Sequence, residues 1–595
     1  MTSVFSRRRT ALAMFGCLAF AAVAWSAEAE RPSGPNLLPK NTLVYARVAD
    51  SRELVDDFMA TSVGRLSQDE KIKPLILHLY GSAAQAFSQV QEQIGLSLAQ
   101  ILAIPQGEIW VAVVGREAAD PAFLAMVEVR DQIAAVRQLL ERGKQAAANE
   151  GATVRTEDFR GVTLTTISDD DEGGVTFCDR EGVVLVGSAT EVVKEVLERW
   201  TASEGAEGSE TLADNREFTG IMRRSVGTKD ERPQLTWFVD PIALFKNVSR
   251  DSGGAQLALA MFPSLGLDGI KAVGGSMIFN TEEFDSISHM HLALDNPRKG
   301  ILEVLAMESG DTTPEDWVPY DTATYMTVLW NAGQSLKSLR KMVDMIRGEG
   351  AFDRFVKSRM SDPLGINFEQ DVLGRVAGRF TYVSWMERPA KINSGTNLIG
   401  IKLTDANAFR KTLEGILERT NANAAKKTHR GVAYYEFPTP PRRNEGVDQS
   451  LVRLPTPVIA IVGDYLLASD SAQCLQAAIA SKADPSKSFA EELDFKLISS
   501  RIRQHLGSTR PGMITFQRPE EAMRAIYDLA TAANTRQRLA TAAETNPGFR
   551  ALHSALEANP LPPFADIAKY LAPAGGMVVS DQSGIHYTAF SLKRE

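Results

Sequence analysis

The chain repeats a short stretch of its own sequence after 280 residues. Residues 37–48 read LLPKNTLVYARV, and residues 317–328 read WVPYDTATYMTV. Four residue types recur in them at the same spacing: Pro39 and Pro319, Thr42 and Thr322, Tyr45 and Tyr325, Val48 and Val328. This spacing is far longer than the roughly 20 to 50 residues of a solenoid unit, so it indicates duplication of a whole domain.

Further identities follow in the same order along both parts of the chain. They include Gly95 and Gly365, Gln100 and Gln370, Gly107 and Gly378, Arg160-Gly161 and Arg430-Gly431, Gly182 and Gly463, Ser188 and Ser469, Pro233 and Pro511, and Gly274-Gly275 and Gly575-Gly576. We therefore predict two copies of one domain, residues 37–296 and 317–595, joined by a linker over residues 297–316.

Each copy contains the same order of predicted elements. Runs rich in β-branched and aromatic residues, such as TLVYARV (42–48), predict strands, and helices with regularly spaced apolar residues lie between pairs of strands. Most strands follow one another through short turns, which favours an antiparallel sheet. The expected class is α+β, with two tandem copies of a domain that has a largely antiparallel sheet and helices packed on one face.

The N-terminus has the pattern of a secretory signal peptide. Three arginines at 7–9 precede an apolar run of about 15 residues, and Ala27-Glu28-Ala29 offers a cleavage site for small residues. The run is too short for a comfortable membrane span, although an uncleaved segment would act as an anchor. Residues 1–29 are therefore predicted to be a signal peptide, and the protein is expected to be periplasmic or extracellular.

The charge balance limits the partners. Loss of residues 1–29 removes three of the 65 basic and one of the 74 acidic residues, which leaves a formal charge of −11. This charge argues against nucleic acid, and against an anionic membrane as a general partner. We expect membrane contact only through an uncleaved N-terminal segment, and a ligand or an envelope protein as possible partners.

Cysteine and histidine provide few candidates for chemistry. Cys178 and Cys474 each align with an aliphatic residue of the other copy, which favours small core side chains over a disulfide or a nucleophile. His289 and His291 lie on one face of a predicted strand, as two metal ligands would, but no further ligand cluster accompanies them. We interpret them as part of a solvated strand face.

Two loops between strands differ in character. Residues 169–172 are all acidic, but they lack the alternating spacing of a calcium loop, so a solvated hairpin tip is the preferred interpretation. The corresponding loop, residues 438–457, is longer, basic and rich in proline, and is the better candidate for contact with a partner. The glycine pairs at 274–275 and 575–576 are expected to mark a turn or a bulge before a strand.

No sequence motif indicates catalysis. The chain contains no nucleophile elbow, no phosphate-binding loop and no dinucleotide fingerprint after a strand. A pair of carboxylates brought together by the fold, as in glycosidases, would leave no local signature. We assign no catalytic, cofactor-binding or metal-ligating residue and no cofactor, and whether the protein is an enzyme stays open, with non-catalytic function favoured.

The chain resembles the bacterial exported proteins grouped as domain of unknown function 3352. The resemblance is carried by LLPKNTLVYARV, by GLDGIKAVGGSM (266–277) and by PEDWVPYDTATYMTVLWN (314–331). It implies a two-copy protein outside the cytoplasm and implies no chemistry. The expected function is a non-catalytic binding or structural role in the periplasm or cell envelope; the alternatives are an exported hydrolase with fold-assembled carboxylates and a carrier of an apolar ligand.

Overall fold

A computed structural model describes residues 31–595, except for residues 118, 169–173, 202–209, 228–230, 390, 392–393, 440–451 and 595. The predicted signal peptide, the acidic run at 169–172 and most of the proline-rich loop therefore lie outside the described residues.

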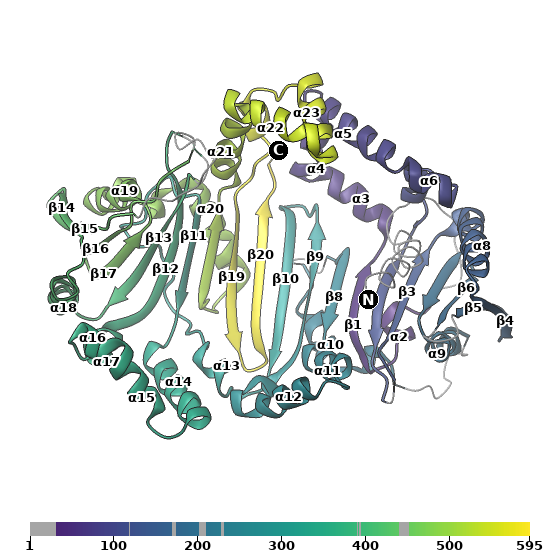
Figure 1. Ribbon diagram of the computed structural model, residues 1–595, viewed down its shortest axis with the longest axis horizontal. Coiled ribbons are helices and arrows are strands. Elements are labelled where there is room, and N and C mark those ends of the chain that lie inside the picture. The colour runs from purple at the N-terminus through teal and green to yellow at the C-terminus, as the bar shows by residue number, and fades with distance from the viewer. Residues whose placement is uncertain are drawn as a thin grey trace.

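The described strands form a single antiparallel sheet of 20 strands, and the class is α+β as expected. From one edge to the centre the order is β4 (Thr153–Phe159), β5 (Val162–Ser168), β6 (Gly174–Arg180), β7 (Val183–Gly187), β3 (Ala122–Glu128), β2 (Ile109–Val114), β1 (Thr42–Val48), β8 (Leu235–Val239), β9 (Ile270–Phe279) and β10 (Phe284–Leu294). The sheet then continues without a break into the second half of the chain (Figure 1).

The second ten strands have the same order, read from the opposite edge. It is β14 (Ala425–His429), β15 (Val432–Glu436), β16 (Val458–Val462), β17 (Tyr465–Ser469), β13 (Gly395–Leu403), β12 (Val376–Met386), β11 (Thr324–Leu329), β18 (Met513–Gln517), β19 (Ala574–Asp581) and β20 (Gly584–Leu592). The halves meet where β10 pairs with β20, with His289 opposite Thr588. The two halves thus share one sheet.

Helices cover one face of the sheet and build the two main cores. In the first half these are α2 (Gly34–Leu37), α9 (Thr190–Thr201) and α10 (Arg216–Arg223); in the second they are α19 (Ala472–Ala483) and α20 (Leu493–Leu506). Helix α9 shows why: its apolar residues recur at helical spacing, and Val192, Val193, Val196, Leu197 and Trp200 are all buried. Tyr45 and Tyr325 from the repeated stretch lie fully inside these cores.

The opposite face is covered only toward its two ends. Helices α7 (Leu98–Leu102) and α8 (Ile133–Asn149) pack on the outer strands of the first half, and α18 (Ala406–Arg419) packs on those of the second. The sequence predicted helices on one face of the sheet. At the two ends of the sheet, the structure has helices on both faces. Between these two helical covers, none of the described helices forms a layer over the central strands on this face.

The remaining helices line the two ends of the strands and form two rims (Figure 1). The upper rim contains α3 (Ser51–Ala60), α4 (Ser62–Gln68), α5 (Lys73–Ala86), α6 (Ser88–Ile94), α21 (Pro519–Thr531), α22 (Ala533–Thr545), α23 (Pro547–Ala558) and α24 (Phe564–Ala568). The lower rim contains α11 (Pro241–Val248), α12 (Gly253–Leu265), α13 (Ile301–Val304), α14 (Ala332–Arg347), α15 (Ala351–Val356), α16 (Asp362–Leu364) and α17 (Phe368–Asp371). Each rim joins helices of both halves, because α5 packs on α23 and α12 lies against α14.

Candidate apolar binding site

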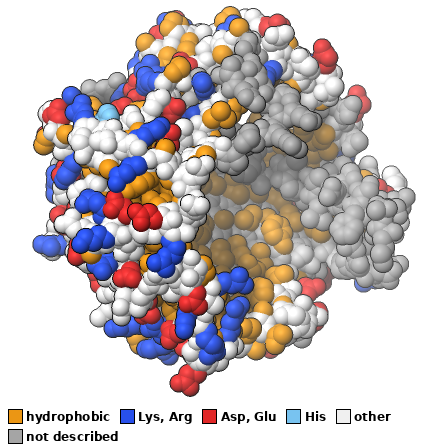
Figure 2. All heavy atoms as spheres, turned by 60° about the vertical axis from the view of Figure 1, so that its left-hand side comes forward, with side chains coloured by type: hydrophobic (Ala, Val, Ile, Leu, Met, Phe, Trp, Pro, Cys, Tyr) orange, Lys and Arg blue, Asp and Glu red, His pale blue; other side chains and the backbone are white. Residues whose placement is uncertain are grey.

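The uncovered middle of the sheet carries a band of apolar side chains, which we call the trough. Side chains alternate between the two faces of a strand, so the residues next to each core position in β1, β8–β12, β18 and β20 point to this face. The apolar trough residues are Val44, Ala46, Trp237, Val273, Met277, Met290, Leu292, Met326, Val328, Phe380, Tyr382, Met513 and Tyr587. All are half-buried except Met290, which is 42% exposed, and Figure 2 shows a hollow lined with hydrophobic side chains.

The backbone beneath the trough is fully engaged. Every central strand pairs with a neighbour on both sides, so the trough has no open strand edge with free amide and carbonyl groups. Its recognition chemistry is therefore mainly the burial of apolar surface, which contributes about 0.8 kcal/mol for each CH₂ group removed from water.

The two glycine pairs lie inside strands beneath the trough, and the expectation of a turn or bulge before a strand was wrong. Gly275 pairs with Met290 in β9–β10, and Gly576 pairs with Ala589 in β19–β20. A Cβ atom on Gly275 would lie 1.9 Å from the carbonyl oxygen of His289, and one on Gly576 would lie 2.7 Å from that of Thr588. The close approach of the neighbouring strand excludes a side chain at both positions.

Four histidines gather on the helix-covered face where β10 meets β20. His289 and His291 of β10 lie beside His586 of β20 and His505 of α20, and His289 Nδ1 is 3.3 Å from His586 Nε2. The ring centroids of His289 and His586 are 5.5 Å apart, and those of His291 and His586 are 5.6 Å apart. His289 and His291 are only 3% and 2% exposed, so the interpretation as a solvated strand face was wrong.

The environment keeps this cluster uncharged. Burial lowers the pKa of His289 to about 4, and burial together with the nearby His289 lowers that of His586 to about 3. Burial also lowers the pKa of His291 and of His505. In the described part of the chain, no group of three or more His, Cys, Asp or Glu is arranged to hold a metal ion.

Each half also buries an ion pair beside its repeated tyrosine. In the first half, Glu108 contacts Arg31 and Arg47 next to Tyr45, with Arg47 Nε 2.5 Å from Glu108 Oε1. In the second half, Glu315 lies 2.8 Å from Arg379 and accepts hydrogen bonds from the hydroxyls of Tyr325 and Thr381. In both halves the acid is buried and paired with arginine.

The two ion pairs lie at corresponding positions of the two halves, but the acidic and the basic residue are exchanged. Glu108 follows Gly107 and Arg379 follows Gly378, so the acid of one half corresponds to the arginine of the other. Glu108 pairs with Arg47 of β1, whereas Arg379 pairs with Glu315, which precedes β11. Because the partners come from different parts of the two halves, comparing the two repeated sequences could not predict that both halves bury an ion pair. Both carboxylates are neutralised by arginine, as in a structural ion pair, and are poorly suited to act as general acid and base.

The cysteine interpretation is confirmed. Cys178 and Cys474 are both buried, unbonded to another cysteine and packed in separate cores. Burial raises the pKa of each thiol to about 12, so neither has the thiolate character of a nucleophile at neutral pH.

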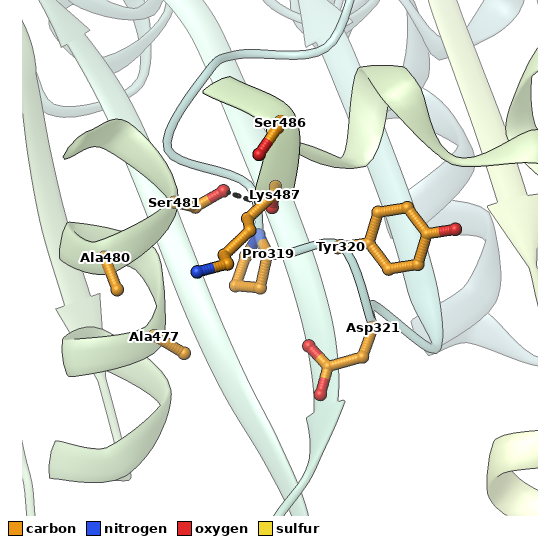
Figure 3. Close-up of a pocket in the computed structure, with 8 residues that line it drawn as sticks. All are labelled: Pro319, Tyr320, Asp321, Ala477, Ala480, Ser481, Ser486 and Lys487. Atoms are coloured by element: carbon orange, nitrogen blue, oxygen red, sulfur yellow. Dashed lines mark hydrogen bonds between the residues drawn. The ribbon is translucent and has the colours of Figure 1, made fainter. Parts of the chain in front are cut away.

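A small open pocket of about 440 Å³ lies beside the second copy of the repeated stretch (Figure 3). Pro319, Tyr320 and Asp321 form one side, and Ala477, Ala480, Ser481, Ser486 and Lys487 form the other. The Ser481 hydroxyl donates to the carbonyl oxygens of Val318 and Lys487, at 3.0 and 2.8 Å, and no histidine lines the pocket. The pocket therefore lacks an activated nucleophile, and its hydrogen bonds fix the start of the second half onto α19.

No family model, no curated protein and no solved structure matches the chain. None of the described helices is long and apolar enough to cross a membrane. The resemblance to the exported family described above stays a prediction, and the trough is the feature of the described structure best suited to hold a ligand.

Proposed function

We propose that the protein binds the acyl chains of a lipid in the trough, as an exported, non-catalytic binding protein of the periplasm or cell envelope. The observation that carries this proposal is the predominantly apolar face over the central strands, in a sheet whose opposite face is covered by helices. Contiguous exposed apolar patches of this kind are rare in soluble proteins and usually mark a binding surface.

The chemistry of the trough favours acyl chains over other apolar ligands. A peptide that adds to a sheet needs an open strand edge, and the central strands have none. Aliphatic, methionine and aromatic side chains predominate on this face, with the hydroxyls of Tyr382, Tyr587, Ser288 and Thr515 between them. Methionines at Met277, Met290 and Met326 can adapt their shape to flexible chains.

Two further elements of the proposal rest on the sequence. The signal-peptide pattern of residues 1–29 supports export, and export would bring the protein to the compartment that contains envelope lipids. Duplication of an ancestral domain is supported by the colinear identities and by the matching order of the first and second ten strands. Duplication would double the length of the apolar face.

The test is lipid extraction from the protein purified out of its own envelope fraction, followed by mass spectrometry. We expect a stoichiometric lipid in the wild type and loss of that lipid in Met290→Arg, which places a charge at the centre of the trough. Leu497→Arg is the matched control, because Leu497 is 49% exposed on α20, outside the trough. A wild-type protein without lipid, or equal lipid in both variants, would exclude the proposal.

A further inference from the structure

Helix α12 of the lower rim is apolar on its solvent side as well as on its inner side. Its sequence, GGAQLALAMFPSL, contains no charged residue, and none of its residues is fully buried. Phe262 packs on Phe245 of α11, with ring centroids 5.7 Å apart. Leu257 and Met261, four residues apart and therefore on one face, are 69% and 41% exposed.

The neighbouring helix α14 continues this apolar surface and adds positive charge. Lys337, Lys341 and Met345 recur every four residues on its exposed side, and Met345 is 65% exposed. Further exposed apolar side chains lie along the same rim: Phe245, Val248, Ile346, Phe355 and Met360. In Figure 2, basic and acidic side chains both lie beside hydrophobic ones along the lower part of the visible face.

The two rims differ in charge although both expose apolar side chains. The lower-rim segments, residues 241–265, 301–304 and 332–371, carry nine basic and eight acidic residues, a net charge of +1. The upper-rim segments, residues 51–94 and 519–570, carry nine basic and twelve acidic residues, a net charge of −3. The average charge of the chain argued against an anionic membrane as a general partner, but the exposed side of α14 departs from this average, with Lys337 and Lys341 beside the exposed Met345.

We propose that the lower rim docks on the surface of a lipid bilayer that contains anionic lipids, with the solvent side of α12 inserted among the headgroups. An interfacial helix of this kind buries its apolar side at the headgroup boundary, while nearby lysines and arginines contact anionic lipids. The apolar residues of the rim are spread along several helices and lie beside basic residues. A bilayer with anionic lipids matches this arrangement, because its apolar interior lies directly beneath a negatively charged surface. The docked rim would place one end of the trough at the bilayer.

The experiment is flotation of the protein with phosphatidylcholine vesicles, with and without phosphatidylglycerol. The protein is purified after export from its own envelope fraction, and the N-terminus of the wild type and of every variant is determined, because an uncleaved apolar segment would itself bind vesicles. We expect binding to the anionic vesicles, weaker binding to neutral ones, and weaker binding as salt increases, because screening reduces the attraction of basic groups.

Two variants test the two components of docking. Leu257→Asp with Met261→Asp should abolish flotation with the vesicles. Lys337→Glu with Lys341→Glu should weaken binding at least fivefold for each lysine, since each basic residue near the surface contributes about 1 kcal/mol. The matched control is Leu77→Asp with Ile526→Asp on the upper rim, where the two side chains are 57% and 60% exposed, and it should bind like the wild type.

Three results would overturn the proposal. These are absence of vesicle binding in the wild type, equal loss in the upper-rim control, and conversion of a dimer to a monomer by the α12 variant, which would assign the rim to self-association. Thermal unfolding of each variant checks that it is folded. Docking does not require that the trough hold lipid, so vesicle binding and lipid extraction can succeed or fail separately.

Discussion

The histidine cluster at the β10–β20 junction makes stability depend on pH. The pKa of His289 is about 4 in the folded protein and about 6.5 in an unfolded chain, so the unfolded state binds more protons between these values. Its contribution to stability is complete above about pH 6.5 and is lost as the pH falls toward 4. The groups facing the cluster are Arg224 and Asp581, which form an ion pair 2.7 Å long.

We predict that the free energy of unfolding falls by up to about 1.4 kcal/mol for each pH unit and each such histidine between pH 6.5 and 4.5. Urea unfolding at a series of pH values measures this slope. His289→Gln and His586→Gln should flatten it, whereas His553→Gln, on a rim helix, should leave it unchanged. An unchanged slope in the first two variants would show that the cluster does not carry the effect.

The buried ion pair of the second half should be costly to break from one side. Glu315→Gln leaves Arg379 buried without a counter-charge, and such changes typically cost about 3–5 kcal/mol. Glu491→Gln is the control, because its pair with Lys496 is about half exposed and should contribute less than about 1 kcal/mol. Urea midpoints compare the two, and equal small losses would contradict the prediction.

Strands β9 and β10 approach so closely that one methyl group should disrupt them. Gly275→Ala places a Cβ atom against the carbonyl oxygen of His289, and we expect a loss of about 3 kcal/mol or more in the free energy of unfolding. Gly143 in α8 is the matched control, because a Cβ there meets nothing within 4 Å. Gly143→Ala should stabilise the helix by roughly 0.5–1 kcal/mol, so the two substitutions are expected to have opposite signs in thermal unfolding.

The strands could be predicted from the sequence because the pattern of each strand depends only on neighbouring residues. Segments such as TLVYARV predicted their strands, whereas α10, α11 and α12 were not recognised. For α12 the reason is that its apolar residues lack a polar side that would give the sequence a helical periodicity. The histidine cluster could not be predicted because His505 and His586 approach His289 only through tertiary packing. The trough could not be predicted from the sequence either. Alternation predicts that a strand has two faces, but which face stays uncovered depends on helices that are distant in the sequence.

One continuous sheet implies one cooperative unit. The β10–β20 pairing runs from Phe284 opposite Leu592 to Ala293 opposite Gly584, and the upper rim adds the ion pairs Lys71–Asp566 and Lys569–Asp69, both 2.8 Å long. We predict a single transition in calorimetry for the whole chain, although its sequence reads as two copies. Ala589→Pro removes a backbone donor in the middle of β20 and should split this transition into two.

Ala532→Pro is a suitable comparison, because Ala532 lies outside the strands, between α21 and α22. It should leave the single transition intact. Two transitions in the wild type would mean that the halves melt independently despite the shared sheet.

The central pairing also constrains the order of events during synthesis. Between the end of β10 and the start of β20 the ribosome must add 289 residues, so the first half emerges with the edge of β10 unpaired. An unpaired, partly apolar edge is a template for association with other chains. Nascent chains of this protein would therefore be most vulnerable to aggregation in the interval before β20 arrives, and a chaperone that shields β10 would act during that interval.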